Sequence, residues 1–227
     1  MENPFEIVRK FESAVSEYTG APYCVAVNSC TNALFLALKY QYNERRIGIE
    51  QPSKFNKNYN QITTAVEIPK YTYLSVPMQI KHAGFDVLFR DEDWIGSYQL
   101  KPFEVFDSAR RFTWDQYKLA RNKARFGNSF TYECVSFHWS KILGIQQGGA
   151  ILHNDPHFDI WARRARFDGR TEGIAPKNDP IQELGWHMYM SPEIAAEGLT
   201  RLYYLKKHNP DLPNDDYPDL SKLEIFK

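Results

Sequence analysis

Apolar side chains recur at helical spacing near the start of the chain. They occupy every third or fourth position, at Phe5, Val8, Phe11, Val15 and Tyr18. The residues Asn3-Pro4 before this run favour a helix start, and Gly20 after it favours a helix end. The same periodicity predicts further helices over residues 33–40, 74–83, 156–167 and from 192 to about 206.

Short apolar runs separate these helices and predict buried strands. The expected strands cover residues 23–27, 66–68, 87–89, 104–106, 134–137 and 150–152. Residues 41–64 are polar and rich in Asn, Gln and Lys, which favours a loop or an insertion. The alternation of strands and helices predicts an α/β fold with three layers and a mostly parallel central sheet over residues 1–207. Residues 208–227 are rich in proline and aspartate and predict an extended tail.

The charge balance limits the partners that the chain can attract. Lys+Arg and Asp+Glu both number 28 in 227 residues, so the formal net charge is zero. Such a chain has no general attraction to nucleic acid or to an anionic membrane, and we expect neither as a partner. No apolar run approaches the roughly 20 residues of a membrane span, and the N-terminus lacks the apolar core of a signal peptide, so we expect a cytoplasmic protein. The three cysteines, Cys24, Cys30 and Cys134, have no CxxC spacing and favour buried small side chains over a metal site or a disulfide framework.

Ligands of α/β sheets bind at the carboxyl ends of the strands. In this chain those ends are residues 28–31, 71–73, 107–110 and 136–141. They supply a Ser-Cys-Thr turn before a helix, aromatic rings, an acid, a hydroxyl and a lysine. These are the groups needed to hold a phosphorylated aromatic aldehyde.

Taken singly, each of these features also has an ordinary explanation. Lys141 follows an apolar and aromatic stretch that would partly desolvate its amine and make it nucleophilic, but most lysines are solvated surface groups. Asp107 ends a strand, where it either caps a helix or keeps a pyridine nitrogen protonated. The turn Ser29–Thr31 offers backbone N–H groups suited to phosphate, although many such turns bind nothing. We interpret Gly148-Gly149 as a tight turn before a strand.

The order of these features resembles the DegT/StrS-type family of pyridoxal-phosphate (PLP)-dependent sugar aminotransferases, which have the fold type I architecture. The segment FESAVSEYTGAPYCVAVNSCTNALFLAL is similar to the family's first helix, strand and phosphate-binding turn. VFDSARR resembles its acid motif, SFHWSKILGIQQGGAIL its lysine motif, and GWHMYMSPEIAAEGLTRL its turn and following helix. The resemblance runs from about residue 5 to residue 205, and the lysine motif and phosphate turn are specific when they occur together in this order.

Two residues carry the chemistry in this resemblance. It implies that Lys141 holds PLP as a Schiff base and moves the proton between cofactor and substrate carbons, and that Asp107 pairs with the pyridinium nitrogen. The implied reaction moves an amino group from an amino acid, expected to be glutamate, to a nucleotide-linked keto-sugar. Active sites of the family lie at a dimer interface, so the resemblance also implies a homodimer.

Further residues would hold the cofactor. By the resemblance, Ser136, Thr31 and Asn32 bind the phosphate, and the ring of Tyr73 stacks on the cofactor. Ordinary core packing would also explain Tyr73. Arg110 stands near the cofactor's phenolic oxygen, where the family usually has Gln or His, and its charge would alter the ring electronics and the substrate fit.

The chain departs from the family at other points. His187 stands where the family carries an Asn that reaches the phosphate in the partner subunit; it either replaces that donor or is a surface histidine. Only residues 94–104 separate the DED run from the acid-motif strand, where the family has an additional strand and helix. The family's small C-terminal domain is also missing. We therefore expect a reduced member whose pocket is open on the substrate side, unless residues 41–64 or a partner subunit cover it.

These departures keep other functions open. A shortened relative could bind PLP, or lack it, and serve a structural or interaction role. Arg110 faintly favours a different PLP reaction, the dehydration of a sugar. The retention of Lys141, Asp107 and Ser136 together favours the aminotransferase.

Overall fold

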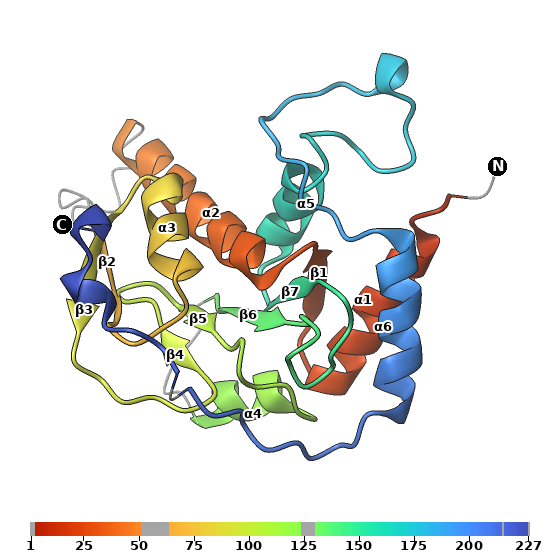
Figure 1. Ribbon diagram of the computed structural model, residues 1–227. Helices are drawn as coiled ribbons and strands as arrows, with labels where there is room; N and C mark the ends of the chain where they lie inside the picture. The colour runs from red at the N-terminus through yellow and green to blue at the C-terminus, as the bar shows by residue number, and fades with distance from the viewer. Residues whose placement is uncertain (1–2, 51–63, 124–129, 215, 227) are drawn as a thin grey trace.

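The computed structural model describes residues 3–50, 64–123, 130–214 and 216–226. In these residues a sheet lies between layers of helices (Figure 1). The strands are β1 (Tyr23–Val27), β2 (Ala65–Pro69), β3 (Asp86–Arg90), β4 (Tyr98–Gln99), β5 (Val105–Asp107), β6 (Tyr132–Ser136) and β7 (Gly149–His153). The α-helices are α1 (Glu6–Thr19), α2 (Cys30–Glu50), α3 (Ser75–Ala83), α4 (Gln116–Lys123), α5 (Pro156–Ala165) and α6 (Pro192–Tyr204). None of the described helices is both long and apolar enough to cross a bilayer.

The α/β fold predicted from the sequence is confirmed, but the sheet is mixed. Its five strands have the order β1-β7-β6-β5-β4, and β2 pairs separately with β3. Only β5 and β6 run parallel in the larger sheet, whereas β7 runs antiparallel to both β6 and β1. The prediction of a mostly parallel sheet is therefore wrong. The physical reason is that residues 137–148 join β6 to β7 without a crossover helix, so the chain turns back and pairs in the opposite direction.

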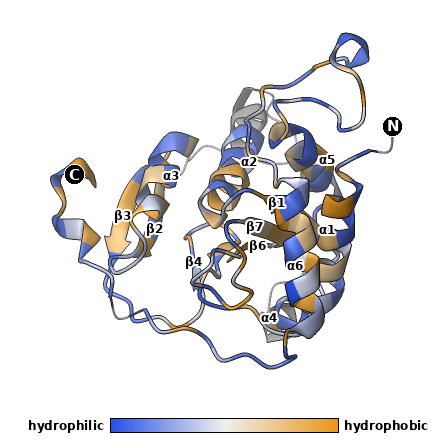
Figure 2. Cartoon of the chain, turned by 45° about the vertical axis from the view of Figure 1, so that its right-hand side comes forward, coloured by the Kyte–Doolittle hydropathy of each residue, from blue (hydrophilic) through white to orange (hydrophobic). Residues whose placement is uncertain are grey.

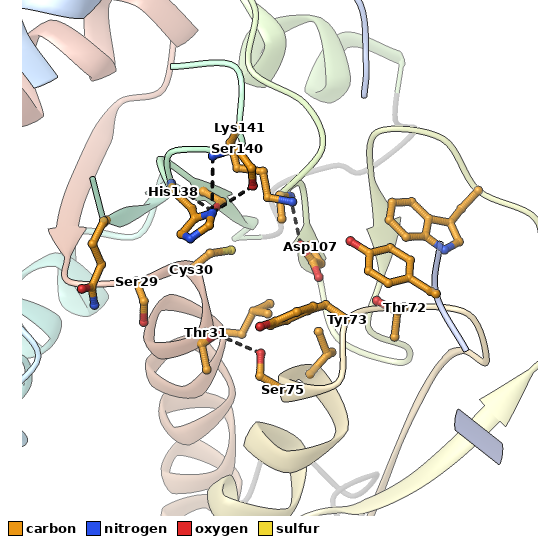
Figure 3. A pocket seen from close by; sticks show the side chains of 18 residues that line it. Ser29, Cys30, Thr31, Thr72, Tyr73, Ser75, Asp107, His138, Ser140 and Lys141 are labelled. Carbon is orange, nitrogen blue, oxygen red and sulfur yellow. Dashed lines mark hydrogen bonds between the residues drawn. The ribbon is translucent and has the colours of Figure 1, made fainter. Parts of the chain in front are cut away.

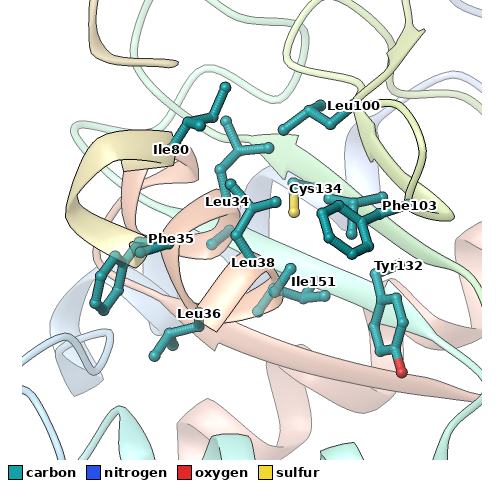
Figure 4. Packing of buried hydrophobic residues seen from close by; sticks show 14 of the residues in the cluster. Leu34, Phe35, Leu36, Leu38, Ile80, Leu100, Phe103, Tyr132, Cys134 and Ile151 are labelled. Atoms are coloured by element: carbon teal, nitrogen blue, oxygen red, sulfur yellow. The ribbon is translucent and has the colours of Figure 1, made fainter. Parts of the chain in front are cut away.

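Side chains alternate between the two faces of the sheet and produce the expected three layers. In β1, Val25 and Val27 pack on one side with α2, α3 and α5, whereas Cys24 and Ala26 pack on the other with α1 and α6. Leu34 and Leu38 of α2 occupy the centre of the first side (Figure 4). Figure 2 shows the matching pattern on α1 and α6, each of which has a hydrophilic and a hydrophobic side. Burial on both faces fixes the register of the strands.

Helix α2 is longer than the sequence predicted. The expected loop over residues 41–64 is wrong for its first part, because α2 continues to Glu50, while residues 51–63 lie outside the described residues. One aromatic contact lies in this extension: Tyr42 packs against Phe85, with ring centroids 5.4 Å apart. Tertiary packing here overrides a polar composition that is neutral for a helix.

A strand that the sequence did not predict joins the two sheets. β4 pairs antiparallel with β5, and two residues later Lys101 exchanges two backbone hydrogen bonds with Glu67 of β2, at 2.8 and 3.1 Å. The short segment over residues 94–104, where the family was expected to have a further strand and helix, thus spans from β5 to β2. Arg90 secures the junction, because its guanidinium donates to the backbone oxygens of both Glu67 and Gln99.

A buried ion-pair cluster ties α1 to α5 and β1. Glu12 of α1, which is 3% exposed, accepts hydrogen bonds from Arg166, Arg163 and the backbone N–H of Ala26. Arg166 is 1% exposed and also donates to the carbonyl oxygen of Ala26. Each charge is therefore paired and hydrogen-bonded, which is the condition under which buried charges are tolerated.

We predict that Glu12→Gln destabilises the fold by about 3–5 kcal/mol, because it removes the nearer counter-charge of the buried Arg166 guanidinium and leaves only Glu172, 3.7 Å away. Urea unfolding followed by circular dichroism measures the change. Glu17→Gln, an exposed position on the same helix, is the matched control and should shift the free energy of unfolding by no more than about 0.5 kcal/mol. Equal effects of the two substitutions would contradict a special role for the buried pair.

Candidate active site

A pocket of about 220 Å³ opens where the N-terminus of α2, the start of α3, the end of β5 and the β6–β7 turn meet (Figure 3). This is the edge of the sheet at which the sequence placed the candidate residues. Five of the eight predicted site residues line the pocket: Thr31, Tyr73, Asp107, Ser136 and Lys141. The structure therefore brings together segments that are more than a hundred residues apart in the chain.

Lys141 reaches the pocket from a tight turn after β6. Its backbone N–H donates to His138 at 2.8 Å, and the His138 ring lies 2.9 Å from the Ser140 hydroxyl, which holds the turn in shape. Burial lowers the pKa of the Lys141 amine, and the nearby charge of Arg110 lowers it further, while Asp107 opposes both. A larger neutral fraction makes this amine a better nucleophile toward a carbonyl group.

Asp107 lies at the floor of the pocket and is 4% exposed. It accepts hydrogen bonds from the Tyr98 hydroxyl at 2.7 Å and from the backbone N–H of Ala109 at 2.9 Å. Burial raises the pKa of this carboxyl, and both hydrogen bonds counteract the rise. No helix begins after Asp107, so the helix-cap interpretation does not apply. The carboxylate is instead oriented for a ligand by its neighbours.

Hydroxyl groups surround the N-terminus of α2. Ser29, Thr31, Ser75 and Ser136 all line the pocket, and the hydroxyls of Thr31 and Ser75 lie 2.8 Å apart. Figure 3 shows Thr31 and Ser75 on the side of the pocket opposite Lys141. Hydroxyls beside free N–H groups at a helix start form a site suited to phosphate.

Gly149 permits this arrangement. A Cβ atom at this position would lie 2.4 Å from the backbone nitrogen of Cys30, so only glycine allows β7 to pass so close to the start of α2. The sequence interpretation of Gly148-Gly149 as a tight turn missed this contact. A glycine pair that begins seven residues after Lys141 was its only signal in the sequence.

Asn32 and His187 do not line the pocket within the single chain. The backbone N–H of Asn32 donates to the Ser29 hydroxyl at 3.2 Å, and its side chain donates to Asn28. The His187 ring lies 2.9 Å from an Asp168 oxygen, and its side chain is 71% exposed. A role of His187 toward a partner subunit stays a prediction.

Arg110 lies at the rim of the pocket and is bound to a segment that the sequence did not implicate. Its Nε donates to the Tyr217 hydroxyl at 3.0 Å and its Nη2 to Asp216 at 2.9 Å. Tyr217 itself lines the pocket, together with Trp94. The sequence offered no signal for either aromatic residue, because neither belongs to a motif or a periodic run.

The residues present fit PLP. A lysine with a lowered pKa and a buried carboxylate are the two groups that hold the aldehyde and the ring nitrogen of this cofactor, and the start of α2 offers donors for its phosphate. The aromatic ring of Tyr73 lies at the same pocket. Fold and pocket together match the large domain of fold type I PLP-dependent enzymes.

Sequence comparison identifies the family. The model of the DegT/DnrJ/EryC1/StrS aminotransferase family matches residues 3–107 and 113–211, so the chain belongs to this family. No curated protein matches the sequence.

Solved structures show the same fold. The sugar aminotransferase CalS13 from Micromonospora echinospora superposes with a TM-score of 0.61 at 18% identity, covering 87% of this chain and 60% of that one. PseC from Helicobacter pylori, an aminotransferase of pseudoaminic acid biosynthesis, gives 0.59 at 15% identity, with 89% and 63% covered. The GDP-4-keto-6-deoxymannose-3-dehydratase ColD gives 0.61 at 14% identity, with 88% and 61% covered. The chain thus spans about three fifths of the length of these relatives.

We predict opposite effects of two substitutions on the pKa of Lys141. Asp107→Asn removes a negative charge that raises this pKa and should lower it further, whereas Arg110→Gln removes a positive charge that lowers it and should raise it. At a fixed pH below the pKa, the first variant should be acylated faster at Lys141 and the second more slowly than the wild type. Mass spectrometry of peptides acylated across a pH series measures both shifts, and shifts of the same sign would contradict the electrostatic assignment.

Proposed function

We propose that the protein is a PLP-dependent aminotransferase that moves an amino group from an amino acid, with glutamate as the expected donor, to a nucleotide-linked keto-sugar. The observation that carries the proposal is the meeting of Lys141 and buried Asp107 in one pocket beside the N-terminus of α2. Family membership supports the reaction class.

The residues of the pocket would divide the task of holding PLP. Lys141 would bind the aldehyde carbon through Nζ, Asp107 would face the ring nitrogen, and Ser136 with the N-terminus of α2 and Thr31 would face the phosphate. When bound, PLP supplies an electron sink for the carbon that loses its proton.

The chain's own groups would then control protons and charge. Lys141, once its amine is free, would take a proton from the substrate carbon and return it at another position, because its lowered pKa leaves part of the amine neutral. Asp107 would keep a proton on the ring nitrogen, held in place by Tyr98 and the Ala109 backbone. The Tyr98 hydroxyl in turn lies 2.5 Å from that of Thr72, so the carboxylate has little freedom to turn away.

A sugar dehydration is the second candidate, and Arg110 favours it. The charge of Arg110 lowers the pKa of Lys141. At the position of Arg110 the family usually has Gln or His. The two reactions leave different products: transamination places nitrogen on the sugar and yields a keto acid from the donor, whereas dehydration releases water and leaves no nitrogen on the sugar. Mass analysis of the sugar therefore separates them.

We predict that PLP binds covalently to Lys141. Borohydride reduction of the protein with added PLP, followed by peptide mapping, should place the pyridoxyl group in the peptide that contains SFHWSK, and Lys141→Ala should abolish the labelling. Lys177→Ala, at an exposed position far along the chain, is the control and should leave it intact. A label on another lysine, or none, would refute the proposed cofactor role and leave a structural or interaction function.

We also propose that the protein acts as a homodimer in which His187 reaches the partner subunit. The support is the exposure of two large apolar side chains, Leu184 at 87% and Trp139 at 71%. Light scattering should give twice the chain mass, and Leu184→Asp should shift the equilibrium toward the monomer, because it places a charge in a buried contact. A wild-type monomer that binds PLP tightly would contradict this proposal.

A further inference from the structure

The segment that follows α6 crosses the mouth of the pocket. Figure 1 shows it running from the end of α6 past β4 to β3. Near its start, Asp211 accepts two hydrogen bonds from Arg111, at 3.0 and 2.6 Å, and the backbone N–H of Leu212 donates to Arg110 at 2.9 Å. The Asn209 side chain donates to the Tyr18 hydroxyl at 2.9 Å. We call the described residues 209–214 and 216–220 the strap.

The strap is attached again on the other side of the pocket. Asp219 forms a β-bridge with Tyr71, and the backbone N–H of Leu220 donates to Lys70 at 3.0 Å. Leu220 is fully buried. Beyond it, Phe226 packs against Phe89 of β3, with centroids 6.0 Å apart. Attachment on both sides holds Tyr217 at the pocket.

Tyr217, near the middle of the strap, forms a wall of the pocket. Its ring lies parallel to that of Trp94, at 16° and 6.3 Å between centroids, and 6.5 Å from that of Tyr73. The Arg110 guanidinium lies 4.8 Å from the ring centroid and donates to the hydroxyl. Trp94 is itself fixed, because its Nε1 donates to the Tyr71 carbonyl at 2.8 Å. Rings held on several sides present a defined shape to a ligand.

Arg110 holds Tyr217 more firmly than it holds Asp216. The Arg110 side chain is 14% exposed, whereas that of Asp216 is 75% exposed, so water screens the ion pair between them. The contact to the Tyr217 hydroxyl lies deeper and combines a hydrogen bond with a cation–π contact. The ring of Tyr217, and not the carboxylate beside it, is therefore the part of the strap that Arg110 positions.

We propose that Tyr217 is a specificity-determining residue that limits the size of the molecules reaching Lys141, and that the strap covers the side of the pocket that was expected to be open. The proposal rests on the proposed function only in taking Lys141 as the reacting group. The rings of Tyr217 and Tyr73 are in contact on this side, so bulky groups stop at the strap and only small groups reach Lys141 past these rings. Closing this side also excludes water from the reacting amine.

The test measures how a small and a bulky reagent reach Lys141 in the protein without PLP. Acetic anhydride is the small reagent and a biotin succinimidyl ester the bulky one, and mass spectrometry quantifies the labelling of Lys141 relative to exposed Lys177. Tyr217→Ala should raise bulky labelling of Lys141 at least tenfold while changing acetylation less than twofold. Tyr217→Phe retains the ring but loses the hydroxyl contact and should give a smaller rise. Tyr203→Ala, an 83% exposed tyrosine on α6, should change neither.

A substitution in the opposite direction guards against a loss of folding. Tyr217→Trp enlarges the wall and should reduce bulky labelling below that of the wild type, an effect that unfolding would not produce. An unchanged ratio of bulky to small labelling in both Tyr217→Ala and Tyr217→Trp would overturn the proposal. The outcome does not depend on the cofactor: if borohydride reduction shows no PLP on Lys141, the proposed function fails, while the labelling ratio still decides the role of Tyr217.

Discussion

The buried ion pair between Glu12 and Arg166 is the constraint on which the pocket depends. Glu12 and Arg166 together satisfy both backbone groups of Ala26, so the charge cluster fixes the path of β1 from inside the protein. β1 leads directly through Asn28 to Ser29 and the first turn of α2. The position of the N–H groups proposed to face a phosphate is therefore set by a contact on the opposite side of the sheet. Two charges enclosed in the interior cost free energy, and their pairing offsets this cost only in one geometry, which makes the cluster a positional restraint as much as a source of stability.

Around this restraint, the pocket is built by close backbone approach and by hydrogen-bonded side chains. Gly149 lets β7 touch the start of α2. Tyr98 connects Thr72 before α3 to Asp107 on β5, so two strand ends are held relative to each other by hydroxyl groups. Lys141 meets them from a third element. The chemistry that the family membership implies thus requires contributions from four separate segments, each fixed by different neighbours.

The parts of the site that neighbouring residues in the sequence determine could be predicted. The strand before Ser29, the strand end at Asp107 and the turn at Lys141 each have an apolar run followed by polar residues, and their order along the chain indicated the family. The direction of β7, the length of α2 and the strand β4 were not predictable, because they depend on pairing and packing between distant segments. Tyr217 could not be found either: it lies in a polar stretch with no periodicity, and its position over the pocket results from contacts with Arg110 and Trp94 that only the folded chain contains.

The junction at β4 has a consequence for how this family can vary in length. Residues 98–101 pair with β5 on one side and with Glu67 of β2 on the other. Backbone hydrogen bonds therefore connect the two sheets at a point where relatives were expected to have more residues. Successive side chains of a strand point to opposite faces. A single residue inserted between Tyr98 and Lys101 would put these two positions out of alternation, so the hydrogen bond from Tyr98 to Asp107 and the backbone bonds of Lys101 to Glu67 could not both be kept. Changes in length are therefore accommodated by the irregular residues 91–97 before Tyr98 and not by the paired residues 98–101.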